Sequence, residues 1–275
     1  MLIAAGLTLG LGSGCDREPS NATPTPHAAP PASRQLDQTP AALPDPSPDD
    51  FRIDAARRLM ADGRLDLAET ALRTVLAEKP ASDRARFFLA VSVAKQKRYG
   101  EARPLYEEIA RSGRTFPERR HVPHFHGWAL FYLGEHDLAR EQFLLHAESV
   151  PEEGDSAFAL GVIALEKDDQ VEAERWLLEA IRRQEGSPAL VREIAKAEAR
   201  LGDLRYRQDR VEEAVVLWQR CVDRWPDHHE AWSKLARGQA RLGRETESAY
   251  ATTQWRNALA RLGREVPPDS PGASP

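Results

Sequence analysis

Apolar and polar residues divide the chain into an apolar start, a proline-rich stretch and a long middle in which apolar segments alternate with polar turns. Nine of the 20 prolines fall between Pro19 and Pro48, and four more lie between Pro267 and Pro275. The proline-rich stretches offer few apolar side chains to bury, which disfavours a packed structure there. This distribution predicts an ordered middle with two proline-rich ends.

One arrangement recurs through the middle of the chain: a polar turn that ends on a small residue. The turn Ala61-Asp-Gly-Arg-Leu-Asp-Leu leads to Ala68, and the same order recurs as far as Ser248. Counting back nineteen residues from each small residue gives six repeats, which begin at Asp49, Asp83, Arg120, Gly154, Ala195 and His229.

Other positions in the same register provide an independent test. The eighth position is small in every repeat, being Ala56, Ala90, Gly127, Gly161, Gly202 and Ala236. The twenty-fourth position is Leu72, Tyr106, Phe143, Leu177, Trp218 and Thr252, which is large in all repeats but the last. Agreement between columns that were not used to set the register shows that the repeats are real.

This register resembles the tetratricopeptide repeat (TPR), in which 34 residues form two packed helices. The resemblance implies an all-α fold, a right-handed superhelical solenoid of about six helical hairpins over residues 49–262. Each hairpin exposes an apolar face that only its neighbour can cover, so the array is expected to fold as one stack.

Departures from the 34-residue spacing predict local changes. Seven extra residues before the fifth repeat equal about two helical turns. We therefore expect a lengthened first helix there, with Ser187 as its cap and Pro188 at its first position. Three extra residues near Phe116 lengthen a loop. The last repeat departs most from the pattern, and we expect Glu247 to Gly263 to form a capping helix.

The first fourteen residues predict a secretion signal. Met1 to Gly14 carries no charged side chain and is too short to span a bilayer as a helix. Small residues then lead into Cys15, which resembles the lipobox of bacterial lipoproteins, although Gly12 stands where that motif has a hydrophobic residue. The resemblance implies lipidation of Cys15 and a membrane-anchored protein in the bacterial cell envelope, facing the periplasm or the exterior. The alternative is a free N-terminus with an incidental cysteine.

Residues 15–48 are expected to be a lipidated cysteine followed by a disordered linker, and residues 263–275 a disordered tail. The stretch from 16 to 48 lacks aromatic and β-branched apolar residues, so it cannot bury enough surface to offset the entropy of ordering. Such a linker can hold a folded domain away from a membrane surface.

The net charge and the cysteine content argue against one class of partner and against an internal disulfide. A net charge of -5 argues against a nucleic-acid partner, because binding phosphates needs a basic surface. Cys221 is the only cysteine after Cys15, so the mature chain can form no internal disulfide. Its place in a small, buried column of the repeat predicts a packed thiol.

In TPR proteins, partners usually lie in the concave groove lined by the first helix of each repeat. The resemblance implies a groove that is apolar and aromatic in the middle and basic in its last two repeats. By that mapping the partner-binding residues are Phe87, Val91, His124, Trp128, Phe131, Tyr132, Phe158, Val162, Lys196, Arg207, Arg237 and Arg241. Such a surface suits a peptide with large apolar anchors and an acidic flank. The alternative is that the aromatic residues, Trp128 above all, belong to the core.

Three histidines near the start of the third repeat are the candidates for metal binding. His121 and His124 would share a helical face while His126 points elsewhere, and no cysteine or close carboxylate completes a tetrahedral set. We therefore expect no metal site and no cofactor. No phosphate-binding loop, nucleophile elbow or catalytic carboxylate pair is present either, so we expect neither an enzyme nor a small-molecule substrate.

Together these features predict a non-enzymatic scaffold for protein-protein interaction. In the leading hypothesis it is a membrane-tethered TPR lipoprotein that docks a peptide or protein and helps assemble an envelope complex. Type IV pilus pilotins and outer-membrane assembly factors are similar in architecture. The alternative is a soluble TPR adaptor or the regulatory subunit of an enzyme encoded nearby.

Overall fold

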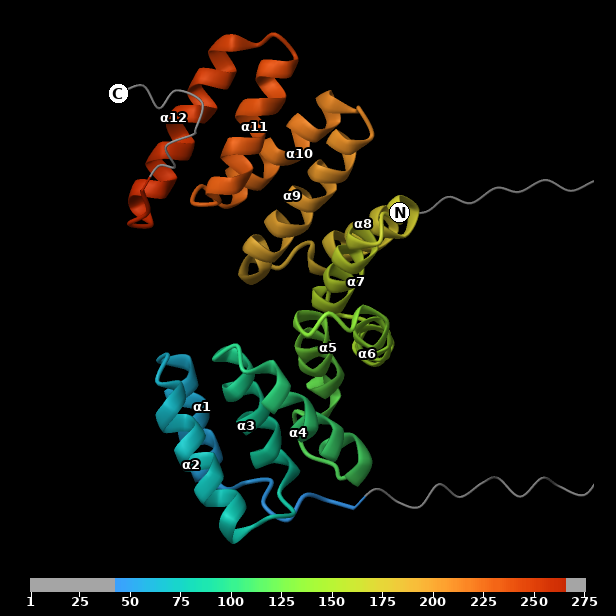
Figure 1. The fold of residues 1–275 in the computed structure, drawn as a ribbon, viewed down its shortest axis with the longest axis vertical. Helices are drawn as coiled ribbons and strands as arrows, with labels where there is room; N and C mark the ends of the chain where they lie inside the picture. Colours follow the sequence, from blue (N-terminus) through green and yellow to red (C-terminus); the bar gives the residue numbers. More distant parts are fainter. Residues whose placement is uncertain (1–42, 266–275) are drawn as a thin grey trace, which may run out of the picture. The chain divides into compact units, whose positions relative to one another are not determined.

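The computed structural model describes residues 43–265, which form twelve α-helices connected by short turns (Figure 1). The predicted signal peptide, Cys15, most of the linker and residues 266–275 lie outside the described residues. Within the described range there is no strand, and an isolated bridge between Pro44 and Thr115 is the one β-type pairing. No helix between residues 43 and 265 has both the length and the apolar content needed to cross a bilayer.

The helices pair into six hairpins, each with a first helix A and a second helix B, and each helix contacts its hairpin partner most extensively. The hairpins are α1 (Phe51–Ala61) with α2 (Leu65–Glu78), α3 (Asp83–Lys95) with α4 (Tyr99–Ser112), α5 (Val122–Tyr132) with α6 (His136–Ser149), α7 (Asp155–Glu166) with α8 (Gln170–Gln184), α9 (Val191–Arg207) with α10 (Val211–Arg224), and α11 (His229–Arg241) with α12 (Glu245–Arg261). Each B helix also packs against the A helix that follows it. The predicted all-α stack of helical hairpins is confirmed.

Every turn between an A helix and its B helix contains a residue in the left-handed conformation. These residues are Gly63, Lys97, Gly134, Asp168, Asp209 and Gly243. Glycine adopts this conformation without steric strain and aspartate tolerates it, whereas for a lysine the conformational energy rises by about 1–2 kcal/mol. The same backbone conformation in all six turns shows that the hairpin geometry is repeated even where the turn sequence differs.

Within the hairpins, a small residue of helix A lies directly against a large residue of helix B. A Cβ atom added to Gly127 would lie 2.8 Å from the ring of Phe143, and one added to Gly202 would lie 2.6 Å from the indole of Trp218. Side chains cannot sustain contacts that short. The predicted requirement for small residues in this column is therefore a direct consequence of helix packing.

The fifth and sixth repeats differ in detail from the prediction. Helix α9 is lengthened at its start, as expected, but Ser187 makes no side-chain cap hydrogen bond. Residues Pro188–Leu190 form a separate 3₁₀ turn, η2, so Pro188 is not the first residue of α9. Helix α12 confirms the predicted final helix, shifted by two residues toward the N-terminus at each end.

The predicted linker ends before residue 48, because residues 43–48 pack against the first two repeats. Asp45 is buried, and its carboxylate accepts hydrogen bonds from the backbone N–H of Arg84 at 2.9 Å and from the hydroxyl of Ser82 at 3.3 Å. The N–H of Asp45 donates to the carbonyl of Thr115 at 2.9 Å. Hydrogen bonds to residues far along the chain order this segment, and composition cannot reveal them.

We expect Gly202→Ala to lower the free energy of unfolding by about 1–3 kcal/mol, because the new methyl group collides with Trp218. Gly100→Ala is the matched control. Gly100 lies in α4 with nothing within 4 Å of an added Cβ, so alanine should stabilise the helix by up to about 1 kcal/mol. Urea unfolding followed by circular dichroism measures both variants, and equal effects would contradict the packing argument.

Candidate partner-binding surface

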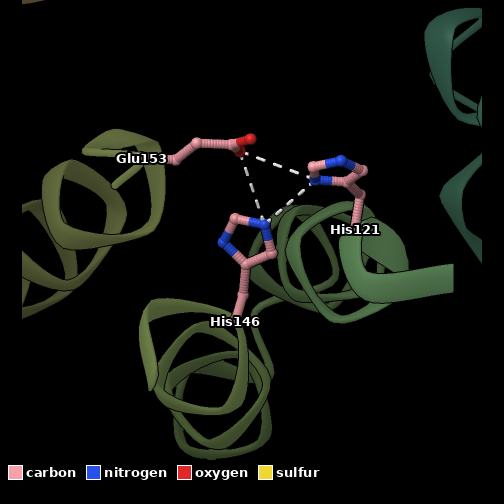
Figure 2. Close-up of side chains that lie close together, drawn as sticks. All are labelled: His121, His146 and Glu153. Carbon is pink, nitrogen blue, oxygen red and sulfur yellow. Dashed lines mark hydrogen bonds and ion pairs between the residues drawn. The ribbon is translucent and has the colours of Figure 1, made fainter. Parts of the chain in front are cut away.

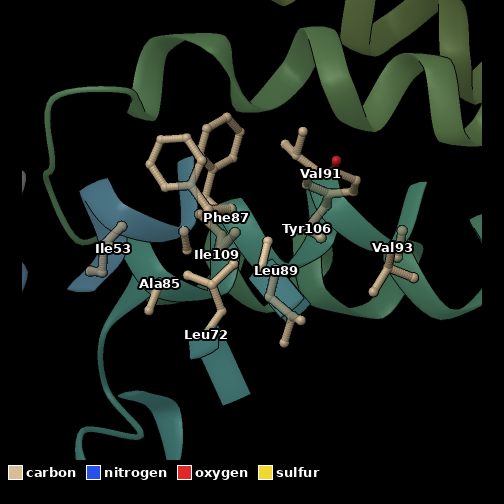
Figure 3. Packing of buried hydrophobic residues seen from close by; sticks show 14 of the residues in the cluster. Ile53, Leu72, Ala85, Phe87, Leu89, Val91, Val93, Tyr106 and Ile109 are labelled. Carbon is tan, nitrogen blue, oxygen red and sulfur yellow. The ribbon is translucent and has the colours of Figure 1, made fainter. Parts of the chain in front are cut away.

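Two residues of the predicted groove are core residues instead. Phe87 and Val91 expose only 2 % and 5 % of their surface, and Figure 3 shows both inside the cluster formed by the first repeats. The ring of Phe87 lies 5.1 Å from that of Phe88, 5.9 Å from that of Phe116 and 5.5 Å from that of Phe125, measured between centroids. The prediction for these two residues is wrong, because both are buried, and Phe87 is covered by Phe116 of the lengthened loop and by Phe125 of α5.

The aromatic residues of α5 form a cluster that runs from the core to the surface. Trp128 is half-buried, with its ring centroid 5.3 Å from that of Phe143 and 5.4 Å from that of Phe131. Tyr132 is 57 % exposed and stacks on Tyr99 at 4.6 Å with an angle of 16° between the rings. Tyr132 is therefore the exposed end of this cluster. Tyr99 belongs to α4, and sequence reasoning missed it.

Two hollows follow one another along a furrow between α7 and α9. The first has a volume of about 350 Å³, and the second has a volume of about 370 Å³. Residues from α5, α7, α8, η2 and α9 line the first hollow, and residues from α7, α9 and the turn after α7 line the second. The predicted groove residues found here are His124, Trp128, Phe158 and Lys196 in the first hollow, and Val162 and Arg207 in the second.

The furrow carries charges of both signs, and several of them are paired. The Nζ atom of Lys196 lies 3.8 Å from the carboxylate of Glu193. The carboxylate of Asp203 lies 2.7 Å from Lys234 and 3.5 Å from Arg200. Such partly exposed pairs contribute little to stability, so their cations can exchange partners with an incoming ligand.

The basic end of the predicted groove lies on α9 and α11, and part of its positive charge is neutralised by an ion pair. The guanidinium groups of Arg237 and Arg241 lie 6.0 and 5.1 Å from the ring centroid of Tyr206, within the range of cation-π attraction. Arg241 also forms an ion pair with Asp209. Arg237 lines a separate hollow of about 470 Å³ on the last hairpin. These two arginines are therefore apart from the furrow.

A histidine cluster lies between the third and fourth repeats, and sequence reasoning found only part of it. His121 Nδ1 lies 3.3 Å from His146 Nε2, and the hydroxyl of Ser156 lies 3.0 Å from Nδ1 of both His146 and His124. Burial lowers the pKa of His124 to about 3 and that of His146 to about 4, so both imidazoles are neutral at pH 7. His146 stands in a column that is apolar in the other five repeats, which is the signal that could have found it.

Cys221 is fully buried in the hairpin of α9 and α10. Burial raises the pKa of its thiol to about 12. A thiol with so high a pKa is not a nucleophile near neutral pH. The prediction of a packed thiol is confirmed.

The repeat pattern identifies the class of protein. The family model for the tetratricopeptide repeat matches residues 53–115, 126–188 and 199–258. The chain therefore belongs to the tetratricopeptide-repeat family, whose arrays are scaffolds for protein-protein interaction. No curated protein matches the chain.

Solved structures share the fold at low sequence identity. A chain of the APC/C hetero-tetramer Cut9-Hcn1 matches with a TM-score of 0.65 and 16% identity, over 78% of this chain and 40% of that chain. This chain thus spans less than half the length of that protein. Pseudomonas aeruginosa pilF matches with a TM-score of 0.62 and 19% identity, over 78% of this chain and 90% of its own. YrrB, described as a TPR protein with an unusual peptide-binding site, matches with a TM-score of 0.50 and 13% identity, over 69% and 93%.

We expect Trp128→Ala to lower the free energy of unfolding by about 2 kcal/mol or more, because its indole packs on Phe143 in the core. Tyr132→Ala should lower it by about 1 kcal/mol, since Tyr132 is 57 % exposed and its ring contacts with Tyr99, Trp128 and Phe131 lie at the surface end of the cluster. Urea unfolding of the two variants measures the difference. A smaller effect for Trp128→Ala than for Tyr132→Ala would refute the assignment of Trp128 to the core side of the cluster.

Proposed function

We propose that this protein is a membrane-tethered lipoprotein of the bacterial cell envelope that docks a peptide or protein segment in the furrow between α7 and α9. In this role it helps assemble a larger envelope complex. The observation that carries the docking proposal is the furrow itself. Six predicted groove residues from three successive A helices line its two hollows.

The furrow offers walls for an apolar anchor and charges of both signs, and the proposed segment places an acidic group near the cations of α9. Trp128 and Phe158 supply apolar walls to the first hollow, and Lys196 lies at the same hollow. Arg207 lines the second hollow further along α9. An aromatic or aliphatic anchor would supply most of the binding energy, and the two cations would set the direction of the bound segment.

The tether in this proposal is a lipid on Cys15 followed by the proline-rich linker. The structure describes the chain from residue 43 onward, and the linker in this proposal is the proline-rich stretch before it, residues 16–42. A flexible chain of that length reaches on the order of 30 Å. That reach would leave the furrow open to partners at or near the membrane.

Photo-crosslinking in the native cells tests the docking surface. A photoreactive amino acid in place of Lys196 or Tyr132 should give discrete adducts with a partner, because both side chains are exposed beside the furrow or the aromatic cluster. Phe158→Ala in the same chain should reduce the yield at Lys196 roughly tenfold, the effect expected when one apolar anchor site is lost.

The matched control position is Val171, which is 79 % exposed on α8 and lies outside both hollows. It should give no adduct of the same mass. Equal adducts at Val171, or an unchanged yield in the Phe158→Ala background, would rule out the furrow as the docking site.

Replacing Cys15 by serine tests the anchor separately, because serine offers no thiol for lipidation. The Cys15→Ser protein should move from the membrane to the soluble fraction when cells are fractionated. Cys221→Ser is the control: it removes a buried thiol and should leave the protein with the membrane. Unchanged membrane partitioning of Cys15→Ser would contradict the lipoprotein proposal, and it would not bear on the proposed docking surface.

A further inference from the structure

Three side chains from separate elements converge between the third and fourth repeats (Figure 2). His121 ends the 3₁₀ turn η1 (Arg119–His121), His146 belongs to α6, and Glu153 lies in the turn between α6 and α7. His121 Nδ1 lies 3.3 Å from His146 Nε2, and the Glu153 carboxylate lies 3.5 Å from the former and 3.7 Å from the latter. In Figure 2 the three groups point toward one common centre.

These separations fit the first coordination shell of one zinc ion. Nitrogen and oxygen ligands lie about 2.0–2.1 Å from zinc, so neighbouring ligands of a tetrahedral ion are about 3.4 Å apart. The three separations of 3.3, 3.5 and 3.7 Å correspond to a distance of about 2.1 Å between a tetrahedral ion and each ligand atom. Two imidazoles and one carboxylate are also a ligand set that zinc uses in proteins.

A buried hydroxyl orients His146 for this role. Ser156 Oγ lies 3.0 Å from Nδ1 of His146 and 3.0 Å from Nδ1 of His124, and Ser156 is fully buried. The hydroxyl has one hydrogen to donate. When it donates to His124, it accepts the Nδ1–H of His146, and the lone pair of His146 Nε2 then faces His121 and Glu153. Metal-binding histidines are commonly held in this way by a partner on the other ring nitrogen.

Without a cation this arrangement leaves the cluster short of donors. With the hydrogens placed in this way, His146 Nε2 and the Glu153 carboxylate are both acceptors, and the Nδ1–H of His121, whose Nε2 accepts from Arg120, is the one donor that the three side chains offer there. The side chain of His146 is only 1 % exposed, so water cannot readily take the place of a donor there. A metal ion would satisfy all three groups at once.

One side of the cluster is open to solvent. The side chains of His121 and Glu153 are 25 % and 34 % exposed, which leaves a path for an ion and room for a fourth ligand. Arg120 lies on this side, where its Nε lies 3.3 Å from His121 Nε2 and its Nη1 lies 3.3 Å from Glu152. Zinc at Nδ1 of His121 requires the ring proton to lie on Nε2, which then no longer accepts the hydrogen bond from Arg120. The exposed Arg120 would keep its hydrogen bond to Glu152 alone.

We propose that His121, His146 and Glu153 bind one Zn²⁺ ion, with the fourth position open to water or to a group from a partner. The ion would fasten η1, α6 and the turn before α7 to one another. It would thereby set the junction between the third and fourth repeats. His124 shares Ser156 with the zinc ligand His146 and also lines the furrow, so the site lies next to the proposed docking surface.

Equilibrium dialysis of the full chain against Zn²⁺, followed by metal analysis, should give one bound equivalent. Co²⁺ in place of zinc should show the visible absorption of a four-coordinate ion. His121→Ala and Glu153→Gln should each weaken zinc binding at least tenfold. Both side chains are partly exposed, so these variants should keep the helix content measured by circular dichroism. Ser156→Ala, which removes only the orienting hydroxyl, should weaken binding by roughly 10–100-fold.

Two controls exclude other ligands. His229→Ala lies on the last hairpin, and Cys15→Ser removes a thiol at the other end of the sequence, so both should bind zinc as the wild type does. Absence of bound zinc in the folded full chain would overturn the proposal. Unchanged affinity in both His121→Ala and Glu153→Gln would overturn it as well, and would show that the three groups form only a hydrogen-bonded cluster.

Discussion

The whole stack depends on one contact, in which a small residue of an A helix lies against a large residue of its B helix. Gly127 against Phe143 and Gly202 against Trp218 leave no space for even a methyl group. This contact sets how closely the two helices of a hairpin approach, and so where the B helix meets the next A helix. The position of α7 beside α9, and hence the furrow between them, follows from contacts of this kind.

Each A helix packs on its B helix with one face, and its other face can line the groove. Neighbouring loops and helices determine whether that second face is covered or exposed. Over α3, the lengthened loop at Phe116 covers Phe87, and that part of the groove becomes core. Between α7 and α9, Leu190 of η2 lines the first hollow without filling it, and the two hollows remain. A family pattern thus names candidate residues, whereas insertions between repeats determine which of them can touch a partner.

The histidine cluster is one of the places where the stack buries polar side chains. His146 occupies a column that is apolar in the other repeats, and its two ring nitrogens face Ser156 on one side and His121 with Glu153 on the other. Buried polar groups are retained when they have partners. His124 both bonds to Ser156 and lines the furrow, so one side chain connects the cluster to the proposed docking surface.

The sequence by itself determined the number, order and register of the hairpins, because small and large residues recur at fixed spacing and each repeat is a local unit. It also indicated the packed thiol of Cys221 and the longer start of α9. Only the tertiary structure decided that Tyr99 stacks on Tyr132, that Asp45 caps the N–H of Arg84, and that His121 meets His146 and Glu153. Those contacts join residues of different helices and loops, and their geometry depends on how neighbouring elements pack, which spacing along the chain does not encode.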